Sequence, residues 1–464
     1  MKQLRYLFKS PYFLILNHLV RWTLLTIPVA ITIGAVVALF LWLLSWAIHF
    51  RFSHTWLLYL LPIAGIVIHF VYKLYGKSSE KGNNLIMDEI HEPGGGVPKR
   101  MAPLVLGATV LTHLFGGSAG REGTAVQIGG SIADFFGRLF GLNEQDSRTV
   151  LMAGIAAGFG AVFGTPLAGT IFAIEVLAVG RLQYDAIIPC LIASIFADQT
   201  VAMIGIHHTA YHITPFVIQP NPGFSLIRFD YLLLVKVILS SVLFGLTSYL
   251  FAEMVHGVKN VSQRLIKTKW LIPVIGGSII IGLTLILGRQ DYLSLGVDPQ
   301  FADSITIQSA FHQGGAHTWS WLWKTIYTTI TLGTGFKGGE VTPLFYIGAT
   351  LGNTLSQLLN APVGLFAALG FIAVFAGATN TPLACTFMGI ELFGGEYALY
   401  FAIACFTAYF FSGHSGIYSS QRIAVPKIFD PHYSKETSIG QSIQRRRQLI
   451  NNRLLKYRDK LTKK

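Results

Sequence analysis

Charged side chains are scarce in this chain, and their scarcity is the most restrictive feature of its composition. Of 464 residues, only 12% are Asp, Glu, Lys or Arg, whereas 52% are hydrophobic, and the mean hydropathy is +0.53. A protein folded in water needs more polar side chains to cover its surface. The composition therefore excludes a soluble globular protein and predicts an integral membrane protein.

Cysteine is also rare. The chain has three cysteines, Cys190, Cys385 and Cys405, and each lies inside an apolar run. Their separation fits no metal-ligand spacing, so we interpret them as small packed side chains. The sequence predicts no metal site and no cofactor, and the cysteines indicate nothing about the cellular compartment.

Several apolar runs fall short of the roughly 20 residues that a perpendicular membrane helix requires. The runs lie at about 23–49, 57–72, 103–115, 150–178, 184–206, 232–256, 270–288, 320–334, 343–359, 362–376 and 382–411. Short runs interrupted by glycine predict tilted or broken helices. The ends of such helices stay in a membrane only where protein or a wet cavity satisfies their free N–H and C=O groups. We therefore predict an all-α polytopic protein with a buried ion site.

Two segments of the chain are nearly identical, Thr165–Glu175 (TPLAGTIFAIE) and Thr381–Glu391 (TPLACTFMGIE). Each follows a Gly-rich apolar stretch and a polar break. The breaks read Gly120-Arg-Glu-Gly-Thr124 in the first half and Lys337-Gly-Gly-Glu-Val-Thr-Pro343 in the second. A duplicated, glycine-broken architecture is how membrane transporters build a binding site near the middle of the bilayer.

The net charge of +13 is concentrated at the ends of the chain, where residues 445–464 hold nine Lys or Arg against one acid, Asp459. The positive-inside rule favours a cytoplasmic tail over a nucleic-acid-binding arm. Lysines at 73, 77 and 81 follow the second run, so both termini are predicted to be cytoplasmic. The His-rich linker at 207–231 carries a single Lys or Arg and should face outward.

The predicted organisation has five parts. They are a cytoplasmic N-terminal segment (1–22), a first membrane repeat (23–206), an extracytoplasmic linker (207–231), a second membrane repeat with the final helix (232–425) and a basic cytoplasmic tail (426–464). The run at 23–49 is longer than the hydrophobic region of a signal peptide and lacks a convincing cleavage site, so we expect it to be retained.

The first polar break places Glu122 at the start of a helical run. Glycines let a backbone approach an ion, and the N–H groups that open a helix present the positive end of its dipole, so an anion is the favoured guest. An ionised Glu122 carboxylate can occupy the place of the anion and leave it when protonated, which would make it both gate and proton carrier. The alternative is a buried Arg121–Glu122 pair that holds a loop.

The second break repeats this logic before a helix whose first turn tolerates Pro343. Thr342 adds a hydroxyl donor. Glu340 would repel an anion unless it is protonated or paired, for instance with Lys337, so a second titrating group and a structural ion pair remain open. Glu175 and Glu391, one in each repeat, are predicted to cap or anchor helices.

These motifs resemble the CLC family of anion channels and proton-coupled anion exchangers over roughly residues 20–425. The resemblance rests on Gly120-Arg-Glu-Gly123, Gly339-Glu-Val-Thr-Pro343 and Gly416-Ile-Tyr418. It implies that Glu122 is the external gating glutamate and that Tyr418 donates to the central anion. It also implies an inverted-repeat fold within a homodimer, with one pathway in each subunit.

Departures from the family pattern point to one branch. Chloride-type members usually read G-S-G-I-P where this chain reads Gly82-Asn-Asn-Leu-Ile86, and G-R-E-G-P where it has Gly120-Arg-Glu-Gly-Thr124. Asn83 precedes Glu122 by 39 residues (122 minus 83), which fits the spacing of the family. With Glu340 and Thr342, these changes resemble the fluoride-exporting branch.

Fluoride is small, strongly hydrated and basic, so its release from water requires strong, close donors such as an Asn amide or a Thr or Tyr hydroxyl. An alternative interpretation makes Asn83 the cap of the following helix. The expected anion-binding residues are Asn83, Gly123, Thr124, Gly339, Val341, Thr342 and Tyr418.

Two further expectations concern the pathway. Phenylalanine edges line it in fluoride-type members. Phe375 and Phe387 lie in suitable segments, but core packing is the favoured interpretation of either. Proton-coupled chloride exchangers carry a second glutamate where this chain has Val176, so the usual inner proton relay is absent.

The sequence thus predicts a fluoride/proton antiporter in a bacterial inner membrane, with fluoride and protons as substrates, no nucleic-acid partner and no enzymatic activity. A chloride/proton exchanger and a passive anion channel of the same fold are alternatives. A distant alternative is an intramembrane serine protease, because Gly413-His-Ser-Gly416 matches a G-x-S-G pattern.

Overall fold

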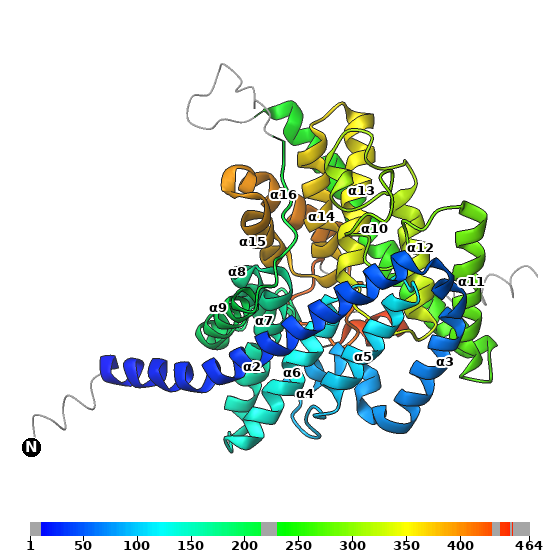
Figure 1. Ribbon diagram of the computed structural model, residues 1–464. Coiled ribbons are helices and arrows are strands. Elements are labelled where there is room, and N and C mark those ends of the chain that lie inside the picture. The colour runs from blue at the N-terminus through cyan, green and yellow to red at the C-terminus, as the bar shows by residue number, and fades with distance from the viewer. Residues whose placement is uncertain (1–10, 215–229, 429–436, 446–447, 449–464) are drawn as a thin grey trace, which may run out of the picture.

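The computed structural model describes residues 11–214, 230–428, 437–445 and 448, and it is built almost entirely of helices (Figure 1). The first half contains α2 (Pro11–Ser53), α3 (Leu61–Val71), α4 (Asn83–His91), α5 (Met101–Leu114), α6 (Glu122–Leu139), α7 (Glu144–Phe163), α8 (Pro166–Glu175) and α9 (Ile187–Met203). The second half contains α10 (Tyr231–Leu265), α11 (Leu271–Leu287), α12 (Ser320–Gly333), α13 (Val341–Leu359), α14 (Val363–Thr379), α15 (Pro382–Phe393) and α16 (Ala398–Phe411). The predicted all-α class is confirmed.

Short elements join these helices. They are the single turns Thr55–Leu60, Tyr72–Gly76, Lys77–Lys81, Tyr184–Ala186, Ser309–Phe311 and Gly395–Tyr397, and the strands β1 (Ala178–Val179) and β2 (Arg422–Ile423). The two strands pair in parallel. They tie the segment after α8 to the segment after α16, so the ends of the two halves are joined.

Within the described residues, four helical stretches are long and apolar enough to cross a membrane. They are Tyr12–Ser53, Thr55–Lys81, Tyr184–Met203 and Tyr231–Leu265. Several other apolar helices have only 10–17 residues. The expected mixture of full-length and short helices is therefore present, and the short helices must end within the protein.

The predicted runs at 150–178 and 382–411 are each broken into two helices. Gly164 ends α7 with φ +71°, and Gly394 ends α15 with φ +89°. This left-handed backbone costs glycine little, and Pro166 opens the helix that follows Gly164 in the first turn, where proline is tolerated. Glycine and proline thus set the break in the first repeat.

The predicted boundary at residue 22 does not coincide with a helix start. Helix α2 begins at Pro11 and continues without interruption to Ser53, with Pro28 inside it. Residues 11–20 are mostly apolar, so nothing in their composition stops the helix there. The first ten residues and most of the predicted tail at 426–464 lie outside the described residues.

The starts of α8 and α15 are each capped by the glutamate at the end of the other helix. Glu391 at the end of α15 accepts hydrogen bonds from Leu167 N (2.9 Å) and Ala168 N (2.8 Å) in the first turn of α8. The Glu175 carboxylate at the end of α8 accepts hydrogen bonds from Leu383 N (3.1 Å) and Ala384 N (2.8 Å) in the first turn of α15. The prediction that Glu175 and Glu391 anchor helices is confirmed, because carboxylates stabilise the positive ends of both helices.

Small residues bring two equivalent helix pairs into close contact. A Cβ atom on Gly370 of α14 would lie 2.0 Å from the Gly348 carbonyl oxygen of α13, and one on Gly129 of α6 would lie 2.1 Å from the Gly154 oxygen of α7. No side chain fits at such positions. Helices α6 and α13, which carry the two polar breaks at their N-termini, are therefore held rigidly by α7 and α14.

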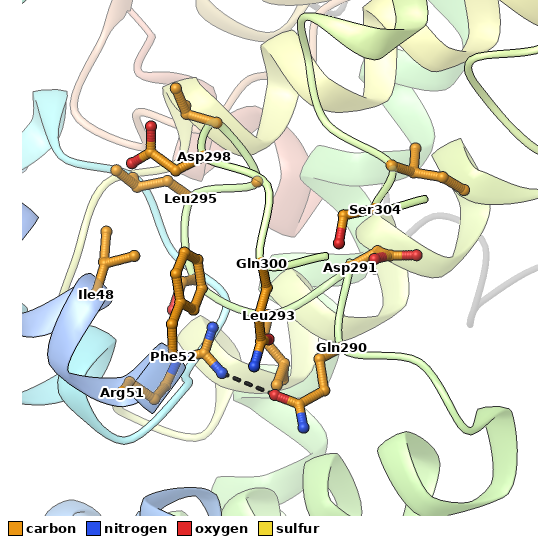
Figure 2. A pocket seen from close by; sticks show the side chains of 14 residues that line it. Ile48, Arg51, Phe52, Gln290, Asp291, Leu293, Leu295, Asp298, Gln300 and Ser304 are labelled. Atoms are coloured by element: carbon orange, nitrogen blue, oxygen red, sulfur yellow. Dashed lines mark hydrogen bonds between the residues drawn. The ribbon is translucent and has the colours of Figure 1, made fainter. Parts of the chain in front are cut away.

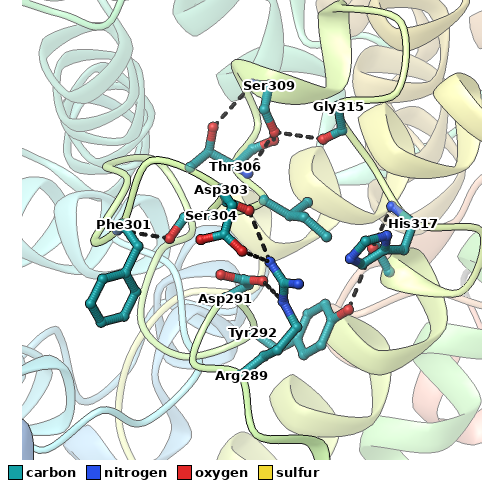
Figure 3. Close-up of polar contacts among 12 residues, drawn as sticks. Arg289, Asp291, Tyr292, Phe301, Asp303, Ser304, Thr306, Ser309, Gly315 and His317 are labelled. Atoms are coloured by element: carbon teal, nitrogen blue, oxygen red, sulfur yellow. Dashed lines mark hydrogen bonds and ion pairs between the residues drawn. The ribbon is translucent and has the colours of Figure 1, made fainter.

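A long connection between α11 and α12 is ordered by polar contacts (Figure 3). The Arg289 guanidinium contacts Asp291 at 2.7 Å and Asp303 at 3.1 Å, and the hydrogen bond with Asp291 raises the pKa of Arg289. Ser309 Oγ donates to the Gly315 carbonyl at 2.7 Å. The connection is therefore a well-packed segment whose conformation is fixed by its own hydrogen bonds and ion pairs.

Candidate functional site

The two polar breaks, 219 residues apart in sequence (339 minus 120), lie against each other in the structure. Gly120 N donates to the Gly339 carbonyl at 2.6 Å, and Gly339 N donates to the Gly120 carbonyl at 2.7 Å. A Cβ atom on Gly339 would lie 2.7 Å from Gly123 N, so glycine is required for the approach. The N-termini of α6 and α13 therefore converge, and their positive dipole ends favour an anion between them.

Gly339 is one of the predicted anion-binding residues, and its own N–H group donates to the Gly120 carbonyl. Gly339 contributes instead by allowing the close approach of the two breaks. The amides that follow it, at Val341 and Thr342 in the first turn of α13, are the donors of the second half.

The Glu122 carboxylate, 1% exposed, occupies the N-terminus of α13. Its Oε2 accepts from Thr342 N at 3.0 Å and from Arg121 N at 3.1 Å, and its Oε1 accepts from the Thr342 hydroxyl. The carboxylate is thus bound as an anion would be bound, by amide and hydroxyl donors at a helix start.

The alternative Arg121–Glu122 pair is present only as a looser contact. Arg121 Nε lies 3.6 Å from Glu122 Oε1 and has no hydrogen-bond partner. The stronger contacts of the carboxylate are those with Thr342 and the Arg121 amide. Arg121 therefore adds positive charge beside the site without fixing the position of Glu122.

Asn83 is the first residue of α4 and is 9% exposed. Its side chain makes no capping hydrogen bond, and its Oδ1 is buried without a partner. Its Nδ2 lies 3.1 Å from the position that a Cβ on Gly123 would take. The capping interpretation is wrong, and the amide faces the start of α6, where it can serve as a donor.

Tyr418 lies in the loop after α16 and is 4% exposed. Ile417 N donates to the Ala378 carbonyl at 2.9 Å, and the charges of Glu122 and Glu340 both act on the Tyr418 phenol. The structure thus brings Tyr418 near the same two helix starts. Its place in the fold agrees with the predicted role as a donor.

Gln421, which the sequence analysis missed, fixes the backbone around Tyr418. Its Nε2 donates to the Val176 carbonyl at 2.8 Å and to the Thr379 carbonyl at 2.9 Å. The first carbonyl directly follows α8, and the second belongs to the last residue of α14. No local pattern around Gln421 marks this bridge, because its partners are distant in sequence.

Two other predicted residues are placed differently from expectation. Lys337 does not pair with Glu340; its ammonium lies 4.4 Å from the centre of the Tyr72 ring, and within the described residues the Glu340 carboxylate has no ion-pair partner. The Thr124 hydroxyl is bonded to the Thr109 hydroxyl at 2.7 Å. Only the backbone amide of Thr124 is left to face an anion.

Aromatic side chains cover Glu122 on the side where residues 206–214 lie, which we call the linker side. A pocket there is lined by Arg121, Glu122, Phe163, His208, Thr209, Tyr211, Thr342, Phe345, Phe371 and Leu392. Phe375 is fully buried and stacks on Phe172, whereas Phe387 is 37% exposed on α15. Core packing explains Phe375, and Phe387 does not line this pocket. Phe345 could have been found, since it follows Thr342 by one helical turn.

A wider pocket borders the C-terminal segment, and we call its side of the protein the tail side. Leu85 and Asp88 of α4 line it together with Ser419, Ser420 and Gln441. Asn83 and Tyr418 stand one or two positions from the lining residues Leu85 and Ser419, so these predicted donors lie close to this pocket.

A third pocket lies apart from Glu122, between the end of α2 and the connection after α11 (Figure 2). Arg51 donates to Gln290 Oε1 at 3.0 Å there. Asp291 and Asp298 also line it. This pocket is lined by one basic and two acidic side chains. The carboxylates would repel an anion, whereas the starts of α6 and α13 present hydrogen-bond donors to it.

The sequence profile of the family described as voltage gated chloride channel matches residues 64–413. The chain belongs to this CLC family. A relative from Pseudomonas syringae pv. tomato, described as a chloride/fluoride channel protein, is 48% identical over 418 residues and covers 90% of each chain. The chain is therefore a polytopic membrane protein of a family of ion channels and transporters.

Solved CLC structures share the fold. A CLC-type fluoride/proton antiporter aligns with a TM-score of 0.80 at 35% identity, over 89% of this chain and 99% of that one. A slow cyanobacterial Cl⁻/H⁺ antiporter aligns with a TM-score of 0.70 at 20% identity, over 84% and 94%, and shows the fold alone. The inverted-repeat CLC-type fold expected from the motifs is confirmed.

CLC proteins are channels or transporters, so the protease alternative is wrong. The structure explains why Ser415 and His414 resemble a catalytic pattern only in sequence. Ser415 Oγ donates to Glu253 Oε1 at 3.2 Å, and His414 Nε2 accepts from Lys427 N at 2.9 Å. Both groups fix the chain after α16 to its neighbours.

Proposed function

We propose that this protein exports fluoride from the cytoplasm in exchange for protons. The observation that carries the proposal is the Glu122 carboxylate bound in the N-terminus of α13 by the Thr342 amide and hydroxyl. An ionised side chain held by anion donors competes with an anion for them, and protonation releases it. The Glu122 carboxyl then couples the export of the anion to the import of a proton.

The donor set supports fluoride as the anion. Asn83 has an amide with an unpartnered oxygen and lies beside the start of α6, and Thr342 and Tyr418 supply hydroxyl groups. Short, strong donors offset the large cost of removing water from fluoride. The similarity to a chloride/fluoride channel protein and to a fluoride/proton antiporter supports the same choice.

In the proposed cycle, a proton from the outside neutralises Glu122, and the carboxyl leaves the start of α13. Fluoride from the tail-side pocket passes between Asn83 and Tyr418 and leaves on the linker side. Glu122 then returns and releases its proton inward. Glu340 is the candidate for the next proton station, because it immediately precedes α13 and has no ion-pair partner within the described residues.

The proposed setting is a bacterial inner membrane with both termini cytoplasmic, the tail side inward and the linker side outward. The excess of Lys and Arg at the ends of the chain supports this orientation. We further expect a homodimer with one pathway in each subunit. Exposed apolar residues on α9 and α16, including Ile195, Phe196, Phe406 and Phe410, offer a surface for it.

The test is transport by purified protein in liposomes, with fluoride, chloride and protons followed by ion-selective and pH electrodes. An outward fluoride gradient should drive uphill proton uptake, and chloride should move far more slowly. Equal rates for the two halides would favour a chloride/proton exchanger. Fluoride flux without proton movement would show a passive channel.

A further inference from the structure

A histidine lies at the mouth of the linker-side pocket that contains Glu122. The chain after α9 folds back over this mouth instead of leaving the protein. The Tyr211 ring packs 5.4 Å from the Phe371 ring and 5.9 Å from the Phe311 ring, centre to centre. Gln308 Nε2 donates to the Ala210 carbonyl at 3.4 Å. His208, between these anchors and α9, is therefore held in place.

The imidazole of His208 is oriented by its neighbours. Its Nε2 lies 3.6 Å from Asp198 Oδ1, too far for a hydrogen bond, and this buried nitrogen has no other partner. The ring packs on the end of α7, where a Cβ on Gly164 would lie 2.5 Å from Cδ2. The side chains of His208 and Asp198 are only 22% and 14% exposed. An imidazole and a carboxylate thus face each other beside the pocket.

The charges around His208 come from several elements. Asp198 on α9 places a carboxylate beside the ring, and Glu122 and Arg121 on the chain at the start of α6 line the same pocket. Tyr211 lines the same pocket, and Glu391 on α15 interacts with the charge of Asp198. His207 and His212 belong to the same segment but are exposed. Two carboxylates and one guanidinium therefore lie around the imidazole at this pocket.

We propose that His208, positioned by Asp198, relays protons between the outside and Glu122. The relay rests on the proposed antiport function and assigns it an outer proton station. Histidine suits this task, because its charge changes between about pH 5 and pH 8. Glu122 alone, sealed by Phe163, Phe345 and Phe371, has little contact with outside water.

The step needs only proton transfers. A proton from the outside solution binds the imidazole and makes it an imidazolium. The imidazolium then passes a proton to a carboxylate oxygen of Glu122, through one water where the gap requires it. The imidazole is neutral again, and the neutral carboxyl no longer attracts the Thr342 donors as an anion does. Asp198 exchanges no proton in this step and acts by positioning the imidazole.

The experiment measures fluoride-driven proton uptake in proteoliposomes at equal pH on both sides, from about pH 5 to about pH 8, the range in which histidine titrates. Equal pH makes the orientation of the protein irrelevant. The variants are His208→Gln and Asp198→Asn, and the matched controls are His207→Gln and His212→Gln. Each variant is compared with the unchanged protein as a ratio of rates at each pH.

We expect His208→Gln to slow proton uptake about tenfold near pH 7, with the deficit shrinking toward pH 5, where solution protons reach Glu122 unaided. The fluoride-to-proton ratio should stay unchanged, because Glu122 remains the carrier. Asp198→Asn, which removes the carboxylate that faces the imidazole, should slow proton uptake near pH 7 in the same way but less strongly. The two controls should follow the unchanged protein.

A His208→Gln profile that coincides with that of the unchanged protein would overturn the relay and leave the antiporter intact. Equal slowing in the His207 and His212 controls would also overturn it, since the effect would belong to the segment. If the unchanged protein moves fluoride without protons, both the relay and the proposed function fail. If His208→Gln does not yield folded protein, Asp198→Asn replaces it. An Asp198→Asn profile that coincides with that of the unchanged protein would then overturn the relay.

Discussion

At the scale of single residues, Glu122 is held by interactions that an anion would use equally well. Its two carboxylate oxygens accept from the Thr342 amide and hydroxyl at the start of α13. The side chain is thus tied to an element from the other half of the chain. A change at Glu122 should affect coupling more than folding.

Glu122→Gln is expected to reduce fluoride-driven proton uptake to the background of protein-free liposomes, because a glutamine amide carries no exchangeable carboxyl proton. A pH electrode records the uptake. Glu144→Gln, at an exposed position in the first turn of α7, is the matched control and should retain coupling. Full coupling in Glu122→Gln would remove this residue from the proton route.

Asn83→Ser should weaken the preference for fluoride over chloride by about 1–3 kcal/mol, the cost of one buried hydrogen bond to a charged group. A hydroxyl reaches less far than the Asn amide that faces Gly123. The ratio of fluoride to chloride flux, measured with electrodes under equal gradients, gives the change. An unaltered ratio would mean that Asn83 does not contact the transported ion.

The residues that could be predicted from the sequence are those whose role is local. Glu122 and Asn83 open helices, and glycines beside them mark the breaks. The hydrogen bond of the Gly339 amide and the contact of Lys337 with Tyr72 could not be predicted, because each partner lies more than two hundred positions away. His208 was seen only as part of an outward linker for the same reason.

At the scale of elements, close helix pairs hold the site. Gly370→Ala should destabilise the protein strongly, by more than the roughly 1–3 kcal/mol typical of overpacking, because the new Cβ would meet the Gly348 carbonyl at 2.0 Å. Gly282→Ala in α11 is the control, since no atom lies within 4 Å of its Cβ position. Thermal unfolding in detergent should show a large decrease in Tm for Gly370→Ala and little change in Tm for Gly282→Ala.

The reciprocal caps allow a second test of an element. Glu175→Gln and Glu391→Gln should each lower the stability by about 1–3 kcal/mol, because charge-assisted bonds to helix-start amides are weakened. Proton coupling should persist in both, as measured by fluoride-driven uptake. Loss of coupling without loss of stability in Glu175→Gln would reveal a proton-carrying role that the structure does not indicate.

Most helix boundaries follow from composition, and the exceptions have physical causes. The repeated Thr-Pro-Leu-Ala motif marks the start of α8 and α15 because proline suits the first turn. The start of α2 at Pro11 was missed because a single Arg among apolar residues does not stop a helix. Predicted single runs at 150–178 and 382–411 proved to be helix pairs.

At the scale of the whole molecule, the site exists only where the two halves meet. The Gly120–Gly339 pairing, the Glu122–Thr342 contacts and the Gln421 bridge each join residues from opposite repeats. The duplication in the sequence indicated that two similar halves build the site. It did not indicate which residues of the two halves pair, such as Gly120 with Gly339. The first half supplies the carboxylate and the Arg121 amide, and the second half supplies the Thr342 amide and hydroxyl.

Flux measurement on the reconstituted, full-length protein tests the central claim most directly. Fluoride, chloride and protons are recorded in liposomes with and without an imposed pH gradient. The account predicts rapid fluoride efflux, much slower chloride efflux and proton uptake against a gradient whenever fluoride leaves. Fluoride efflux that moves no protons, or chloride that moves as fast as fluoride, would contradict it.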